Sequence, residues 1–172
     1  MRVVAGELRG RRIEAPPGVD TRPTTDKVRE AVFNALFSLD LIRDAVVVDL
    51  YAGSGAMGIE ALSRGAARCT FVERDRAALR TLRANLAHLG LEDRSTVLAG
   101  DARVLAPTLP ADFVVADPPY GFDAWPDLLA VVQTEFVVAE AEREIEPPPD
   151  WEATRARRYG RTWVTFLERN PR

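Results

Sequence analysis

Four consecutive residues, Asp117-Pro118-Pro119-Tyr120, carry the groups best suited to chemistry in this sequence, and they follow an apolar run over residues 113–116. The Asp117 carboxylate and the Pro118 carbonyl could each accept a hydrogen bond from one NH2 group and hold its nitrogen toward an electrophile. Prolines stiffen the turn, and the Tyr120 ring could stack on a flat base. The residues predict a catalytic site for methylating an exocyclic nucleobase amine. A capped, proline-rich turn is the structural alternative.

The elements expected to position this turn alternate between strand and helix. Apolar runs predict strands over residues 45–50, 69–73, 95–99, 113–116 and 135–139. Helical spacing predicts helices over residues 55–63 and from an Asp75 cap to a stop at Gly90. Alternating strands and helices are typical of a parallel sheet covered by helices on both faces. The sequence therefore predicts an α/β fold in which Asp117 ends the fourth strand.

Segments at both ends of the chain add to this sheet. Two β-like runs, 153–159 and 162–168, flank Gly160 and predict an antiparallel hairpin after the five parallel strands. Thr24 or Thr25 could cap a helix whose apolar positions continue to residue 39. Residues 1–13 indicate a short N-terminal hairpin with exposed arginines. We expect one domain over residues 1–172, with a basic hairpin extension over 1–20 and a catalytic core over 21–172.

A cofactor site is expected after the first strand. Gly53, Gly55 and Gly58 form a G-x-G-x-x-G pattern, and Glu73 ends the second strand. Glycines let a cofactor approach the backbone, and a carboxylate suits the hydroxyl groups of a ribose. These features predict an adenosine-containing cofactor, either a dinucleotide or S-adenosylmethionine. A tight turn followed by a surface acid is the structural alternative.

Two further acids at strand ends favour S-adenosylmethionine. Asp49 lies just before the glycine loop, where it would repel a pyrophosphate but could hold the cationic amino group of a methionyl moiety. Asp101 follows the third strand and could accept a hydrogen bond from an adenine amine, while Ala102 offers its N–H to a ring nitrogen. With Glu73 and Asp117, these acids stand at the ends of strands one to four, where ligands bind in such folds.

Composition limits the class of protein. A chain of 172 residues with 47% hydrophobic residues suits one globular domain. The absence of a long apolar run and the charged N-terminus predict a cytoplasmic protein without a membrane partner. The single Cys69 is expected to be buried, and His88 to have no metal or catalytic role. We expect no metal site, and a monomer in the absence of charged heptads.

Charge is distributed unevenly along the chain. The net charge is −3, yet the first thirty residues carry seven bases against five acids, and residues 151–172 carry six arginines against two acids. The middle of the chain is therefore at −9. An acidic body with basic ends fits a protein that meets a polyanion along one edge, although a solvated arginine-rich surface gives the same pattern.

Taken together, these motifs resemble the class I S-adenosylmethionine-dependent methyltransferases, and among them the RsmD-type enzymes that methylate guanine N2 in small-subunit (16S) ribosomal RNA. The resemblance covers nearly the whole chain and rests on five segments: residues 3–12, 21–30, 49–55, 117–120 and 158–160. Segment 21–30 is the most specific to the family. The glycine loop and the Asp-Pro-Pro-Tyr turn are shared with DNA amino-methyltransferases, so they indicate the reaction but not the substrate.

The resemblance implies a Rossmann-like, seven-stranded, mostly parallel sheet. It also implies that the loop over residues 22–25 and the helix after it lie over the cofactor and near the target base. We expect Asp117, Pro118, Pro119 and Tyr120 to be catalytic. The expected cofactor-binding residues are Thr25, Asp49, Tyr51, Ala52, Gly53, Gly55, Glu73, Arg74, Asp101 and Ala102. The expected RNA-binding residues are Arg9, Arg11, Arg12, Arg22, Thr24 and Lys27. An arginine is familiar at position 27, and lysine cannot make its planar, two-pronged contact.

The expected function is therefore S-adenosylmethionine-dependent methylation of guanine N2 in ribosomal RNA, free or in the small ribosomal subunit. Three alternatives remain open on the sequence. A DNA adenine-N6 or cytosine-N4 methyltransferase would share the Asp-Pro-Pro-Tyr turn, and an NAD-binding oxidoreductase would share the glycine loop. A non-catalytic RNA-binding module on the same fold is the third.

Overall fold

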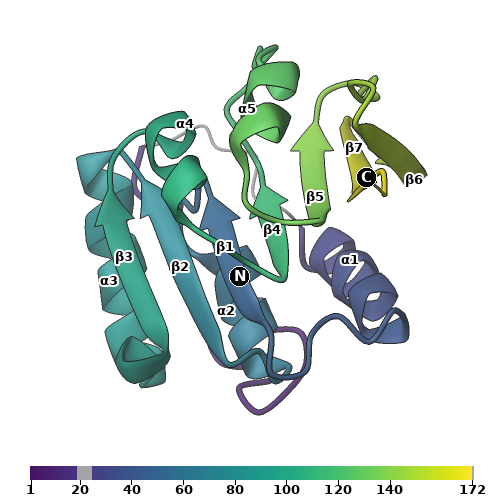
Figure 1. The fold of residues 1–172 in the computed structure, drawn as a ribbon. Coiled ribbons are helices and arrows are strands. Elements are labelled where there is room, and N and C mark those ends of the chain that lie inside the picture. The colour runs from purple at the N-terminus through teal and green to yellow at the C-terminus, as the bar shows by residue number, and fades with distance from the viewer. Residues whose placement is uncertain (19–24, 172) are drawn as a thin grey trace.

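The computed structural model describes residues 1–18 and 25–171. Seven strands form one sheet in the order β3-β2-β1-β4-β5-β7-β6 (Figure 1). The strands are β1 (Val46–Leu50), β2 (Arg68–Glu73), β3 (Ser95–Ala99), β4 (Phe113–Ala116), β5 (Phe136–Ala141), β6 (Trp151–Tyr159) and β7 (Thr162–Arg169). Strands β1 to β5 pair in parallel, while β7 runs antiparallel to both β5 and β6. The predicted parallel sheet with a C-terminal antiparallel hairpin is confirmed.

Helices cover both faces of this sheet, as predicted. One hydrophobic cluster packs α1 (Asp26–Ser38), α2 (Ala56–Ser63) and α3 (Arg76–Leu89) against one face. A second cluster packs α4 (Ala102–Leu105) and α5 (Trp125–Val131) against the other. Figure 1 shows α4 and α5 in front of the sheet and the longer helices behind it. Short 3-10 turns, η1 (Glu92–Arg94) and η2 (Ala106–Thr108), complete the element order.

The predicted helix boundaries have the expected local causes. The Thr25 hydroxyl accepts a hydrogen bond from the Val28 N–H at 3.2 Å and so caps α1. The Asp75 carboxylate accepts from the Ala78 N–H at 2.8 Å and caps α3, which ends at Gly90 in the left-handed conformation. Helix α5 was not predicted from the sequence, although Pro126 near its start is a typical helix-initiating residue.

Residues 1–13 of the N-terminal extension form a hairpin, with an isolated β-bridge between Arg2 and Arg12. Its backbone hydrogen bonds run from the Val3 N–H to the Arg11 carbonyl at 2.9 Å and from the Gly10 N–H to the Val3 carbonyl at 2.9 Å. The extension therefore has the predicted hairpin form, and its residues 1–13 contribute no strand to the seven-stranded sheet.

A buried ionic group fixes this extension to the core. The Glu60 carboxylate on α2 accepts hydrogen bonds from the N–H groups of Val4 at 2.9 Å and Ala5 at 3.0 Å. The same carboxylate accepts from Arg64 Nε at 2.8 Å and lies 3.9 Å from Nε of the fully buried Arg29. Burial lowers the pKa of Arg29, and the charges of Asp26 and Glu60 oppose that shift. Removing the Glu60 charge would leave a buried guanidinium undercompensated.

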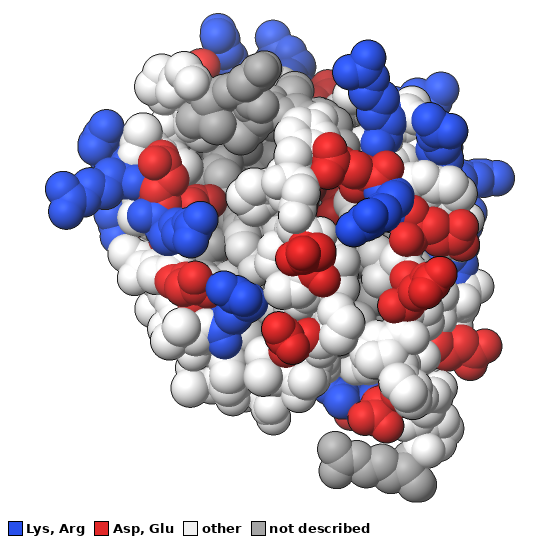
Figure 2. All heavy atoms as spheres, turned by 90° about the horizontal axis from the view of Figure 1, so that it is seen from above, with Lys and Arg blue, Asp and Glu red and all other residues white. Residues whose placement is uncertain are grey.

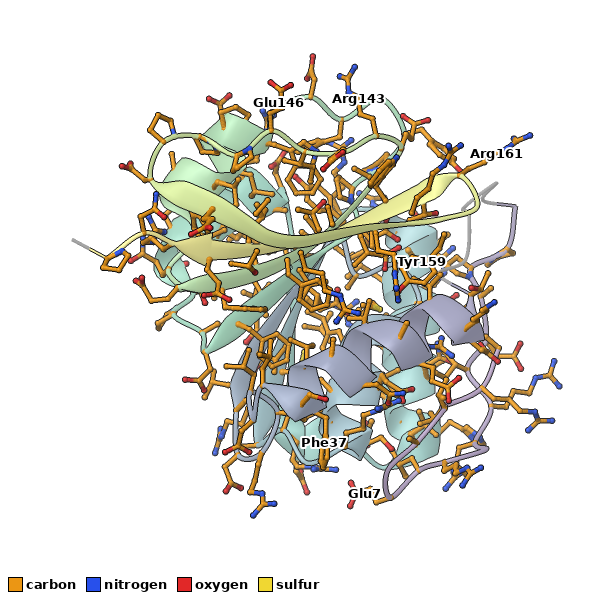
Figure 3. The ribbon with its side chains drawn as sticks, turned by 90° about the vertical axis from the view of Figure 1, so that its right-hand side faces the viewer. Glu7, Phe37, Arg143, Glu146, Tyr159 and Arg161 are labelled. Carbon is orange, nitrogen blue, oxygen red and sulfur yellow. The ribbon has the colours of Figure 1, made fainter. Side chains whose placement is uncertain are left out.

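The tip of the extension lies at the amino edge of the sheet. Gly6 contacts the end of α2 so closely that a Cβ there would lie 1.9 Å from the Ser63 carbonyl oxygen. The Arg11 guanidinium donates to the His88 carbonyl at the end of α3, at 2.9 Å. Both helices follow parallel strands, so their C-terminal ends lie at the edge opposite the strands' carboxyl ends. Figure 3 shows Glu7 at this lower end with Phe37, far from Arg143 and Glu146.

Candidate active site

A cavity of about 580 Å³ opens at the carboxyl edge of the parallel strands. Its lining includes the four predicted strand-end acids, which are Asp49, Glu73, Asp101 and Asp117. Parallel pairing with β1 at the centre brings these ends together: Glu73 pairs with Ala99, and Leu50 pairs with both Val72 and Ala116. The structure therefore gathers the predicted acids in one cleft, at the edge where ligands bind in such sheets.

Asp49 lies deep in this cavity and is only 3% exposed. Its Oδ2 accepts a hydrogen bond from the Gly58 N–H at 2.9 Å, so the carboxylate joins β1 to the first turns of α2. Burial raises the pKa of Asp49 well above its ordinary value, and the Gly58 hydrogen bond opposes this shift. The negative charges of Asp117 and Glu73 add a smaller rise. A neighbouring cation would therefore stabilise the ionised form of this carboxylate.

Glu73 holds the glycine loop and the start of the next loop with one carboxylate. Its Oε2 accepts from the Gly53 N–H at 2.9 Å, and its Oε1 accepts from the Arg74 and Asp75 N–H groups, each at 2.8 Å. A carboxylate has about four acceptor positions, so these three bonds leave capacity for a ligand hydroxyl. The predicted acid at the end of β2 therefore also shapes the loop that it faces.

Asp101 combines a capping role with an ionic one. Its Oδ1 accepts from the Arg103 N–H at 2.8 Å, which caps α4, and its Oδ2 lies 3.8 Å from Arg74 Nη1. Ala102, the first residue of α4, is buried in the cavity wall. Asp101 and Arg74 thus line the side of the cavity next to β3. Arg103 Nε lies 3.9 Å from Oδ1 of the same carboxylate.

The Asp-Pro-Pro-Tyr turn forms the opposite wall of the cavity. Asp117 is half-buried and Pro118 is buried, whereas the Tyr120 side chain is 54% exposed. The turn closes through a hydrogen bond from the Phe122 N–H to the Pro119 carbonyl at 3.3 Å, with Gly121 at φ +78°. The carboxylate-bearing and the aromatic residue of this turn therefore both line the cavity.

Three aromatic rings that the sequence argument did not assign as a group also line the cavity. Tyr51 meets Phe122 edge to face at 5.6 Å, and Phe122 meets Trp125 at 5.1 Å. Tyr51 has φ +60°, a conformation that few large residues adopt, and burial raises its pKa. These rings provide an apolar wall beside the acids. Phe122 and Trp125 fall in the 121–126 segment, to which no function was given from sequence.

The buried acid Glu140 on β5 was also missed, because in the sequence it appears at the end of a short apolar strand. It lines the cavity together with Glu142. Glu140 is only 2% exposed, and glutamate is rarely buried to this extent. Alternation in the sequence gives no sign of this burial, since the strand is covered on both faces.

The glycine loop meets the cavity through Tyr51, Ala52 and Gly53. A Cβ at Gly53 would meet no atom within 4 Å, so open space lies beside the backbone at this position. Gly55 and Thr25 do not line the cavity. Gly55 caps α2 in the left-handed conformation, and Thr25 caps α1.

A side chain from α3 supports this loop from behind. The buried Asn85 donates from Nδ2 to the carbonyls of Ser54 and Glu14, both at 2.9 Å, and accepts from the Glu14 N–H at 3.0 Å. Asn85 thus ties the glycine loop to the N-terminal extension. The sequence offered a weak signal for it, namely an amide on the apolar stripe of a helix.

Of the predicted RNA-binding residues, the four that the structure describes do not line the cavity. Arg9 is exposed in the N-terminal hairpin, and Arg11 is bonded to the end of α3 at the opposite edge of the sheet. Arg12 pairs with Glu14 at 2.9 Å, and Lys27 is exposed on α1. Two other predicted residues, Arg22 and Thr24, lie outside the described residues.

Surface charge around the cavity is segregated. Figure 2 shows the molecule from the side of the strands' carboxyl ends, with acidic side chains near the middle and most basic ones around the rim. In the part of the chain that the structure describes, no cluster of His, Cys, Asp and Glu could hold a metal ion. No described helix has the length and apolarity needed to cross a bilayer. The buried Cys69 has its pKa raised by burial and does not line the cavity.

The strand order, the antiparallel β7 and the cavity at the carboxyl edge define a class I methyltransferase fold. Residues 1–168 match the family model described as "Conserved hypothetical protein 95", and the chain belongs to that family. A solved Escherichia coli structure, yhhF, whose name assigns it provisionally to the methyltransferases, superposes with a TM-score of 0.85 at 33% identity and covers 100% of this chain and 99% of that one.

Two relatives in sequence carry more specific names. A Bacillus subtilis protein, YlbH, named provisionally as an rRNA methyltransferase, is 38% identical over 98% of this chain and 99% of its own length. An Escherichia coli protein named ribosomal RNA small subunit methyltransferase D is 42% identical over 129 residues. That alignment covers 70% of this chain and 60% of the relative.

Proposed function

We propose that this protein transfers a methyl group from S-adenosylmethionine to the exocyclic N2 amine of a guanine in small-subunit ribosomal RNA. The observation that carries the proposal is the Asp117–Tyr120 turn, which opens into a cavity lined by three further strand-end acids. The names of the relatives support ribosomal RNA as the substrate. Family and fold argue against the oxidoreductase alternative, because the related proteins are named as methyltransferases.

The cavity residues fit S-adenosylmethionine. Asp49 suits a cationic amino group because its buried carboxylate has a raised pKa and gains from a positive neighbour. Glu73 suits ribose hydroxyls, and the open space beside Gly53 lets a ligand approach the loop backbone. Asp101 and Ala102 suit the polar edge of adenine, with Tyr51, Ala52 and Arg74 around it. When bound, this cofactor supplies a methyl group on a positively charged sulfur.

The residues of the turn act on the substrate amine. Asp117 and the Pro118 carbonyl each accept a hydrogen bond from the NH2 group, which orients the nitrogen lone pair toward the methyl donor. Pro118 and Pro119 keep these acceptors in place, and Tyr120 stacks on the base. When the nitrogen has formed its new bond to carbon, its surplus proton leaves to the Asp117 carboxylate or to water. Positioning is thus the main contribution of the protein.

We also propose that residues 1–172 work as one catalytic unit, with 1–20 as a structural extension of the core 21–172. The contacts of Glu60 and Asn85 with the hairpin support this division, because they fix it against α2 and α3. Under this proposal the protein acts in the cytoplasm, where its ribosomal substrate is made.

The test is a transfer assay with labelled S-adenosylmethionine on naked ribosomal RNA, on small ribosomal subunits that lack the modification, and on duplex DNA. We expect label in RNA or subunits, recovered as N2-methylguanosine, and none in DNA. Asp117→Ala should reduce transfer by about 100-fold or more, the scale of a lost positioning group, while calorimetry still detects cofactor binding. Transfer to DNA alone would refute the substrate, and full activity of Asp117→Ala would refute the catalytic role.

A further inference from the structure

A second hollow lies beside the catalytic turn, and its walls come from two distant parts of the chain. It is lined by Tyr120, Glu142, Arg158 and Arg161. Tyr120 and Glu142 line the main cavity as well, so the hollow continues directly from the catalytic site. Two arginines of the C-terminal hairpin therefore lie next to the ring on which the target base is proposed to stack.

The hairpin holds these arginines on a short, defined turn. Tyr159 pairs with Thr162, which leaves only Gly160 and Arg161 in the loop, and Gly160 has φ +60°. Such two-residue turns have few conformations. Figure 3 shows Arg161 projecting outward from this turn, while Tyr159 faces α1. The backbone thus directs Arg161 away from the core.

Arg158 is held by the same turn. Its Nε donates to the Gly160 carbonyl at 2.8 Å. This bond uses one of the five N–H donors of the guanidinium, so most of its binding capacity remains for a ligand. The arginine is therefore partly preorganised, which lowers the entropy lost when it binds.

The acid in the hollow has a different task. Glu142 Oε2 accepts from the Gly121 N–H at 2.8 Å, which ties the loop after β5 to the catalytic turn. Two guanidinium groups facing one such carboxylate leave the hollow with a net positive charge. A hollow with this lining suits an anion, although it adjoins a cavity lined by acids.

We propose that Arg158 and Arg161 bind the RNA phosphate adjacent to the target guanosine and so position the base on the catalytic turn. This inference rests on the proposed function, and it identifies a surface of the protein that would contact the RNA backbone. When the base of a nucleotide stacks on Tyr120, the phosphate of that nucleotide lies beside the hollow. Guanidinium groups match phosphate oxygens with paired hydrogen bonds. The tip of the N-terminal hairpin, at the opposite edge of the sheet, cannot contact this phosphate.

The test compares Arg158→Ala, Arg161→Ala and the double variant with a control, Arg157→Ala, which removes an exposed arginine of the same strand that does not line the hollow. We expect the double variant to raise KM for RNA about tenfold with little change in kcat. The dependence of log K on log salt should weaken by about 0.7 for one phosphate lost on a single strand. Binding of S-adenosylhomocysteine and the melting temperature should match the control.

A chemical substitution in the RNA locates the contact. An oligonucleotide spanning the methylated guanosine is made with a neutral methylphosphonate in place of the adjacent phosphate. We expect this change to raise KM about tenfold for the wild type and the control and to have little effect on the double variant. If the wild type methylates RNA but the double variant behaves like Arg157→Ala, the phosphate site is refuted and the proposed function stands. If the wild type transfers no methyl group to any RNA, both are refuted.

Discussion

Replacing Asp49 by Asn separates the effect of its charge on folding from its effect on cofactor binding. The substitution keeps an oxygen that can accept from the Gly58 N–H, which now donates to Oδ2 at 2.9 Å. It removes a negative charge from a site that is 3% exposed and close to two other acids. The variant should therefore be more stable than the wild type without ligand, and should bind the cofactor less tightly.

The stability change has a defined pH dependence. Burial raises the pKa of Asp49, so the folded protein holds the proton more tightly than the unfolded chain does. Ionising Asp49 then costs stability, and this cost is absent below the unfolded pKa of about 3.9, grows with rising pH and is complete above the folded pKa. The difference between burying an ionised carboxylate and burying a neutral amide at the same position is about 1–3 kcal/mol. For a chain of this size that corresponds to a rise in melting temperature of about 3–9 °C at pH 7.

Cofactor binding should change in the opposite direction. A hydrogen bond to a charged group contributes about 1.5–3 kcal/mol, so Asp49→Asn should weaken S-adenosylhomocysteine binding about 10- to 150-fold. The assays are thermal melting from pH 4 to pH 8 without ligand, and calorimetric titration at pH 7. Equal affinity in variant and wild type would show that Asp49 does not hold the amino group. A variant less stable than the wild type at pH 7 would refute the argument from burial.

Three further substitutions test the supports of the site. Asn85→Leu should destabilise the protein by about 2–4 kcal/mol, because three hydrogen bonds are lost. It should also weaken cofactor binding, and denaturant unfolding and calorimetry measure the two effects. The control Arg83→Ala, on the exposed face of α3, should change neither. Gly58→Ala should cost about 1–3 kcal/mol, because its Cβ would lie 2.3 Å from Phe71 Cε1. The same change should cost less when it is made in a Phe71→Leu protein and compared with Phe71→Leu alone, and an equal cost in both backgrounds would contradict the steric cause. Glu60→Gln should cost up to about 3–5 kcal/mol, because the buried Arg29 guanidinium would lose one counter-charge and keep that of Asp26 beside it. The backbone amides of the N-terminal hairpin should then exchange with deuterium faster, and unchanged exchange would refute the anchoring role.

The parts of the fold that were predicted correctly depend on local signals. The strands are continuous apolar runs, and the caps at Thr25, Asp75 and Gly90 are short-range motifs that the structure confirms. The strand-end acids could be placed together because parallel strands end at a common edge. The fold class and the grouping of these acids therefore follow from the pattern of apolar residues and from the place of each acid at the end of a strand.

The features that were missed depend on tertiary contacts. Glu140 is buried because β5 is covered on both faces, and Asn85 is buried because the N-terminal hairpin folds back over α3. The tip of that hairpin also reaches the edge opposite the cavity, where Arg11 binds the end of α3. Charge counts along the chain could not show this position, because they carry no information on which edge of the sheet a segment meets.

The most direct measurement of the central claim is mass spectrometry of nucleosides from small-subunit ribosomal RNA. The RNA is taken from the parent strain, from a strain lacking this gene, and from that strain supplied with the wild type or with Asp117→Ala. The proposed function predicts that N2-methylguanosine falls on deletion and returns with the wild type but not with Asp117→Ala. An unchanged N2-methylguanosine content in the deletion strain would contradict it.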